Sequence, residues 1–105
     1  DVVKRVSVEP NPFTPNADNI NDAALITYDI LRVVEDIPVT LEVYDLSGRV
    51  VRRWTNDRSV GSFTESWDGK DDNSNLVTPG TYLIKLTGNT DDGDFVSTRV
   101  VSVVY

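Results

Sequence analysis

Short runs of alternating apolar and polar residues, separated by turn-forming sequences, constrain the fold of this chain more than any other feature. Gly, Pro, Asn and Asp concentrate between these runs, which cover residues 2–8, 24–31, 39–44, 49–54, 63–67, 81–87 and 95–104. Strands and turns that alternate in this way are typical of sandwiches and barrels. No segment keeps the apolar period of a helix over an ordinary helix length. The pattern predicts an all-β sandwich of about seven antiparallel strands.

The period-two alternation also predicts which side chains face the core. The sets expected to point inward are Val2, Val6 and Val8; Ala24, Ile26, Tyr28 and Ile30; Val39, Leu41 and Val43; and Tyr82, Ile84 and Leu86. Trp67 ends a run of the same kind and is expected to close the core. Residues 55–61 are expected to form a polar loop, and residues 88–94 a hairpin connection.

Composition excludes several classes of partner and of chemistry. The 105 residues contain 10 Lys and Arg against 17 Asp and Glu, and the net charge of −7 repels phosphate backbones and anionic headgroups. We therefore expect no nucleic acid binding and no membrane insertion, and no apolar run has the length of a membrane span. Cys and His are both absent. Disulfides, thiolate or imidazole metal ligands and His-based catalysis are excluded as a result.

Three stretches of sequence carry a resemblance to a known family. Residues 11–22 read NPFTPNADNIND, residues 39–52 read VTLEVYDLSGRVVR, and residues 67–82 read WDGKDDNSNLVTPGTY. In this order they resemble the N-P-F-x-P-N-G-D-G-x-N-D opening, the V-x-L-x-V-Y-D-x-x-G-R-x-V-R hairpin and the W-D-G-x-D stretch of the immunoglobulin-like domain of the flagellar hook-capping protein. Gliding-motility-associated and C-terminal domains of secreted bacterial proteins are similar. The resemblance implies an immunoglobulin/fibronectin-III-like sandwich.

The resemblance also implies a place of action, which is extracellular or at the cell surface. Residues 1–105 fit one domain with its own core, and we expect this domain to be excised from a longer secreted or surface protein. The role is less constrained than the architecture, because the same domain type serves flagellar caps, surface proteins and exported enzymes.

One loop invites a calcium interpretation. Asn16, Asp18 and Asp22 place hard oxygen ligands at short spacing, and Ca²⁺ takes six to eight such oxygens. The alternative is an Asx-rich turn whose side chains cap backbone N–H groups without any metal. The cofactor expectation is therefore either none or one structural Ca²⁺ bound by these three residues.

Two further acidic clusters are weaker candidates for calcium. Residues 71–75 carry Asp71, Asn73 and Asn75 at the first odd positions of an EF-hand loop, but Leu76 stands where that loop requires Gly. Asp91, Asp92 and Asp94 surround Gly93 at an expected hairpin tip. For both clusters a solvated turn is the favoured interpretation.

Catalysis is not expected. Pairs of carboxylates can act as general acid and base, but here they fall in expected exposed turns rather than in a concave pocket. The ligand-binding residue that the sequence offers is Trp54, since an exposed indole can stack on sugar rings beside the cations of Arg52 and Arg53.

Two non-catalytic functions follow. The first is a structural or assembly module of a bacterial secreted or surface protein, which contacts other domains or subunits through sheet edges and loop tips. The alternative is an accessory carbohydrate-binding module that holds a polysaccharide for an extracellular hydrolase. We favour the first, because few aromatic residues are expected to be exposed together.

Overall fold

The computed structural model describes residues 3–15, 22–90 and 93–104 of the chain. These described residues contain no helix with the length and apolar character needed to cross a membrane. The described residues form seven strands in the order β1 (Val3–Glu9), β2 (Ala24–Ile30), β3 (Ile37–Tyr44), β4 (Val50–Arg58), β5 (Gly61–Trp67), β6 (Gly80–Thr90) and β7 (Gly93–Val103).

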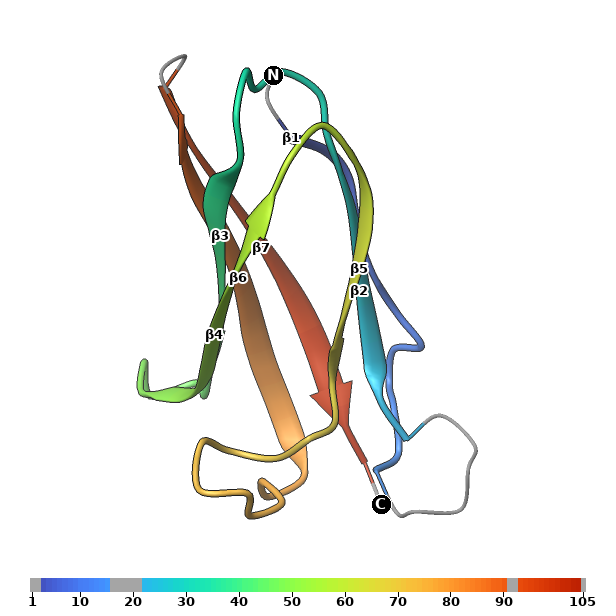
Figure 1. The fold of residues 1–105 in the computed structure, drawn as a ribbon. Coiled ribbons are helices and arrows are strands. Elements are labelled where there is room, and N and C mark those ends of the chain that lie inside the picture. The colour runs from blue at the N-terminus through green and yellow to red at the C-terminus, as the bar shows by residue number, and fades with distance from the viewer. Residues whose placement is uncertain (1–2, 16–21, 91–92, 105) are drawn as a thin grey trace.

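The strands form two packed sheets (Figure 1). One sheet has three strands in the order β1-β2-β5, and the other has four in the order β4-β3-β6-β7. All the paired strands run antiparallel. The chain is long and narrow, with extents of 42 × 27 × 20 Å, and β1 begins at the opposite end from the end of β7. The predicted immunoglobulin-like sandwich of seven antiparallel strands is confirmed.

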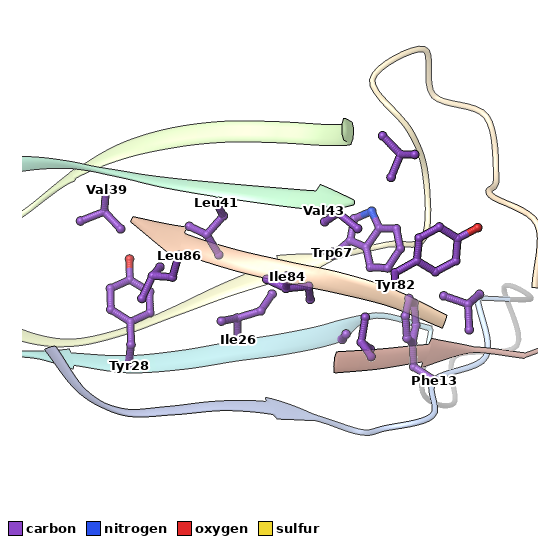
Figure 2. Close-up of a cluster of buried hydrophobic side chains, with 14 of the residues drawn as sticks. Phe13, Ile26, Tyr28, Val39, Leu41, Val43, Trp67, Tyr82, Ile84 and Leu86 are labelled. Carbon is purple, nitrogen blue, oxygen red and sulfur yellow. The ribbon is translucent and has the colours of Figure 1, made fainter. Parts of the chain in front are cut away.

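The core lies between the two sheets and contains the side chains that the alternation predicted for β2, β3 and β6. Figure 2 shows Trp67, Tyr82 and Phe13 grouped at one end of this core and Tyr28 at the other. Trp67 is 1% exposed, as expected for a residue that closes the core. Its indole lies edge-on to both other rings, with ring centroids 5.4 Å from Phe13 and 5.5 Å from Tyr82. Such edge-on pairs are a favoured packing of aromatic rings.

The first strand differs from the simple alternation. Its pairing with β2 shifts between Lys4 and Ser7, and Arg5 within this shift has a φ of 58°. The shift changes which side chains face inward, so that Val3 packs against the core together with Val6 and Val8, both of which were predicted. Val2, which was expected in this set, lies outside the described residues.

Residues 55–58 were expected to be a loop, and this prediction is wrong. They continue β4, and Thr55 to Arg58 pair with Thr40 to Ile37 of β3. The period-two alternation does continue through this segment, but its inward side chains are polar, so no apolar pattern marked it as a strand. Likewise, residues 88–90 extend β6 and residues 93 and 94 begin β7, which shortens the predicted hairpin connection.

Candidate functional site

The three stretches that carry the family resemblance meet at one end of the sandwich. The first stretch begins within residues 10–13, here called the crossing segment, which pass from the three-stranded sheet to the outer edge of β7. The Asn11 amide accepts a hydrogen bond from Ser102 N–H and donates one to Val100 O, both at 2.9 Å. Phe13 then pairs with β7 through its backbone, donating to Ser102 O at 3.0 Å. The asparagine side chain thus substitutes for a residue of a neighbouring strand.

The third stretch forms a tight turn directly beside the first. Trp67 donates its indole N–H to Lys70 O at 2.9 Å, and Asp68 Oδ1 accepts from Lys70 N–H at 3.0 Å. Gly69 between them has a φ of +79°, and a Cβ at that position would lie 2.8 Å from the ring of Pro15. Glycine is therefore required here both by the backbone conformation and by the close approach of the first stretch.

The second stretch is the β3–β4 hairpin, which a single carboxylate organises. Asp45 Oδ1 accepts hydrogen bonds from Ser47 N–H, Ser47 Oγ and Arg49 N–H at 2.6 to 3.0 Å. These bonds, with that from the Ser47 hydroxyl the largest, lower the pKa of Asp45. The carboxylate caps the turn in its ionised form, which explains why an Asp begins this part of the motif.

The loop at residues 71–75 is closed by its own hydrogen bonds. Asp71 Oδ1 accepts from the N–H groups of Asn73 and Asn75 at 2.9 and 3.0 Å, and Asp71 N–H donates to Asn75 O at 2.8 Å. This is an Asx-capped turn, in which one Asp71 oxygen accepts from two backbone N–H groups of its own loop. Leu76, in the position of the EF-hand glycine, is half exposed.

The main calcium candidates fall largely outside the described residues. Asn16 and Asp18 lie outside the described residues, as do Asp91 and Asp92 of the expected hairpin tip, while Asp22 is half-buried just ahead of β2. Among residues 3–15, 22–90 and 93–104, no three carboxylate side chains gather as a metal-ligand set. Calcium binding by Asn16, Asp18 and Asp22 stays a prediction.

A buried polar group, which the sequence analysis did not single out, lies between the edge strands β4 and β5. Glu65 is 6% exposed and accepts hydrogen bonds from four side chains. The donors and distances are Tyr28 Oη at 2.7 Å, Asn56 Nδ2 at 2.9 Å, Arg58 Nη2 at 2.9 Å and Trp54 Nε1 at 3.2 Å. Arg58 also donates its Nε–H to Tyr28 Oη at 3.2 Å. We call these five residues the Glu65 cluster.

The electrostatics of the Glu65 cluster keep its carboxylate ionised. Burial raises the pKa of Glu65, but the hydrogen bonds from Arg58, Tyr28 and Trp54 together outweigh it and hold the pKa below its usual value. Burial, reinforced by the hydrogen bond to Glu65, raises the pKa of Tyr28 to about 12. Donors from both sheets engage the two Glu65 oxygens, so the cluster joins the sheets.

Trp54, the residue proposed from sequence to stack on a sugar, belongs to this cluster. Its indole is half-buried, packs against the core and donates to Glu65. The guanidinium of Arg52 lies 5.9 Å from the ring centroid. A sugar ring would thus meet an indole that is partly covered and has a cation at its face.

A hollow lies at the opposite end from the motif stretches. It has a volume of about 590 Å³ and is lined by residues 32–38 together with Asn89 and Thr90. Val34 in this loop is 95% exposed.

The sequence did hold a signal for the Glu65 cluster. Glu65 stands at an inward position of β5, between the inward residues Phe63 and Trp67. On β4, the inward positions after Trp54 are Asn56 and Arg58. A charge at a core position requires a partner of opposite charge. The polar residues Asn56 and Arg58 at inward positions of β4 were candidates for that partner.

The comparisons with known proteins agree with this geometry. The sequence model of the FlgD Ig-like domain matches residues 28–92, which cover strands β3 to β6, the last residues of β2 and two of the three motif stretches. The chain belongs to the FlgD Ig-like domain family. A comparison with curated protein sequences gives no match.

Several larger proteins of known structure contain a domain similar to this chain. FlgD from P. aeruginosa is 27% identical, with a TM-score of 0.61, over 77% of this chain and 61% of that one. Dimeric latent PorU from Porphyromonas gingivalis is 25% identical, with a TM-score of 0.75, over 94% of this chain and 9% of that one. PorZ from the same organism, an essential surface component of the type-IX secretion system, shares the fold at 18% identity, with a TM-score of 0.57 and 95% and 11% coverage. The chain thus spans less than two thirds of each of these proteins.

Proposed function

We propose that this FlgD-type domain is a non-catalytic structural module of a bacterial secreted or cell-surface protein, and that it contacts neighbouring domains or subunits. The observation that supports the proposal is that polar side chains of the motif stretches form hydrogen bonds with the backbone of this same chain. These side chains are Asn11, Asp45, Trp67 and Asp68. A motif built in this way specifies a rigid sandwich, and the function then resides on the surfaces that the sandwich presents.

The absence of catalysis is part of the proposal. The buried carboxylate of Glu65 is the group most like a catalytic residue in its burial, and four donors occupy it. The sequence contains no His and no Cys that could act as base or nucleophile.

The alternative, a polysaccharide-binding module, has less support because Trp54 is held inside the Glu65 cluster. Affinity electrophoresis through gels containing soluble polysaccharides distinguishes the two functions. Retardation of the chain, abolished by Trp54→Ala and kept by the folded variant Tyr44→Ala, would favour the carbohydrate function. Unchanged mobility in every gel favours the structural one.

The structural role is tested in the bacterium that produces the protein. A photocrosslinking amino acid replaces Val34 or Leu46, which are exposed at opposite ends of the sandwich. Surface biotinylation of the same cells reports location. We expect biotinylated protein and discrete protein adducts from at least one end. Protein that is inaccessible to the reagent and forms no adduct from either end would contradict the proposal.

A further inference from the structure

The four edge strands of the sandwich differ in how their backbone is protected. An edge strand presents unpaired N–H and C=O groups that can pair with another strand, and proteins usually guard such edges with charges, bulges, Pro or a covering segment. Here the edges are β1 and β5 in the three-stranded sheet, and β4 and β7 in the four-stranded sheet.

Three of these edges carry a guard. On β1 the register shift beside Arg5 interrupts the strand. On β4, Asp72 covers the edge, since its N–H donates to Val51 O at 2.9 Å and its carboxylate accepts from Arg53 N–H at 3.3 Å. On β7, the crossing segment hydrogen-bonds along the outer edge.

The fourth edge, β5, has no comparable guard among the described residues. Its pairing with β2 runs without a shift over the whole strand, and no other described segment pairs with it. Its outward side chains are Ser62, Thr64 and Ser66, which are exposed, short and uncharged. Nothing on this outward row opposes the approach of another strand.

The inward side of β5 also suits a neighbour. Glu65, the charge on this strand, is already buried and fully hydrogen-bonded, so an added strand would not have to remove it from water. Phe63 is half-buried at the same edge, with the guanidinium of Arg58 4.8 Å from its ring centroid. An added strand would cover the remaining apolar surface of this ring.

We infer that β5 pairs antiparallel with β5 of a second copy of the chain, so that two three-stranded sheets become one continuous sheet. Such an interface is two-fold symmetric, and the outward row of β5 is self-complementary under that symmetry. In a register centred on Thr64, each Ser62 faces Ser66 of the second copy and the two threonines face each other. Hydroxyl pairs of this kind stabilise antiparallel strands, and no like charges meet in the outward row.

The salt dependence of association distinguishes a second copy from a partner of opposite charge. Each chain carries a net charge of −7, so two copies repel each other and salt strengthens their association by screening. A basic strand from a different protein would be attracted instead, and salt would weaken its binding. The inference deepens the proposed structural role, on which it rests, by naming one partner and the edge that it uses.

The experiment is sedimentation equilibrium of the intact chain from about 0.01 to 1 mM, in 0.05 and 0.5 M NaCl. We expect the mass to rise from 11.7 kDa towards twice that value, and to rise further at the higher salt. Thr64→Lys places two like charges opposite each other and is expected to weaken association at least about tenfold. The matched control is Thr55→Lys, which changes an exposed threonine on the guarded edge β4 and is expected to leave association unchanged.

Amide NMR shifts on dilution give the location, with changes expected at residues 61–67. Thermal unfolding of both variants verifies that they fold. A mass that stays monomeric at 1 mM overturns the inference, and so does a dimer that Thr55→Lys weakens as much as Thr64→Lys. If the chain is monomeric in sedimentation but forms protein adducts in cells, the β5 pairing is wrong and the structural role stands. If the chain dimerises but forms no adducts in cells, the β5 pairing stands and the proposed structural role is contradicted.

Discussion

The two lateral sides of the sandwich are closed by different means. On the side of β1 and β7, the crossing segment adds backbone pairing to β7, and Arg99 donates to Val6 O at 3.2 Å. On the side of β4 and β5, the Glu65 cluster joins the sheets with side chains alone. Backbone pairing tolerates changes of side chain, whereas a buried charge requires that every partner be present. The two sides should therefore respond differently to equivalent substitutions.

The largest expected effect is on the side-chain-closed side. Glu65→Ala leaves Arg58 and the Tyr28 hydroxyl without their acceptor in a buried setting, and we expect a loss of about 3 kcal/mol in the free energy of unfolding. Urea denaturation followed by tryptophan fluorescence measures it. The control is Glu9→Ala, an exposed carboxylate on β1, with an expected change within about 0.5 kcal/mol. A loss below about 1 kcal/mol for Glu65→Ala would mean that the cluster does not stabilise this side.

The second effect is a dependence on alkaline pH. Tyr28 has its pKa raised to about 12 in the folded protein, whereas an unfolded tyrosine ionises near 10. Its contribution is therefore complete below pH 10 and is lost as pH rises towards 12, because the unfolded state releases its proton first. We expect about 2 kcal/mol of stability to disappear over this range. Urea unfolding at pH 9, 10 and 11 measures how the free energy of unfolding falls with pH. The fall should be smaller in Tyr28→Phe. An equal fall in that variant would mean that other groups cause it.

The third prediction applies the same substitution to both sides. Asn56→Ala removes a donor to the Glu65 carboxylate, and hydrogen bonds to charged groups are worth about 2 kcal/mol. Asn11→Ala removes two bonds to the backbone of β7, but the pairing of Phe13 remains, and we expect a loss of about 1 kcal/mol. The two variants are compared by thermal unfolding under identical conditions. An equal or larger loss for Asn11→Ala would reverse the proposed difference between the sides.

The smallest expected effect concerns calcium binding. If Asn16, Asp18 and Asp22 hold an ion with the millimolar affinity of extracellular modules, 1 mM CaCl₂ adds about 0.4 kcal/mol, or roughly 2–3 °C in Tm relative to EDTA. The variant with Asp18→Asn and Asp22→Asn should lose this increment. An identical Tm in both solutions contradicts the site and leaves an Asx-rich turn.

The strands that pack apolar side chains could be predicted from sequence, and those that pack polar ones could not. The inward sets of β2, β3 and β6 follow the period-two pattern, since apolar burial dominates each of those strands. The second half of β4 follows the same geometry, but Asn56 and Arg58 point inward towards a charge on β5. The inward side chains of this half of β4 are explained by their contacts with β5 in the other sheet. The alternation of residues along a single strand does not show such contacts.

The crossing segment illustrates a second limit. Pro10 directly follows the last residue of β1, where a proline cannot continue the strand pairing, but no sequence pattern indicated that the chain would then join the other sheet. The amide of Asn11 completes that junction by bonding to residues about ninety positions away. Among the candidate site residues, Trp54 was expected to stand beside cations and does, yet its indole N–H was not expected to be engaged.

The pairing of Phe13 with Val103 is parallel, and β1 begins at the opposite end of the molecule from the end of β7 (Figure 1). Tension applied through the two ends of the chain would pull these two segments past each other along their own direction. The backbone bonds at Phe13 and the side-chain bonds at Asn11 would then be strained together rather than opened one after another. The same few residues that join the two sheets would therefore act as a mechanical clamp, whose rupture force single-molecule stretching could compare between the original chain and Asn11→Ala.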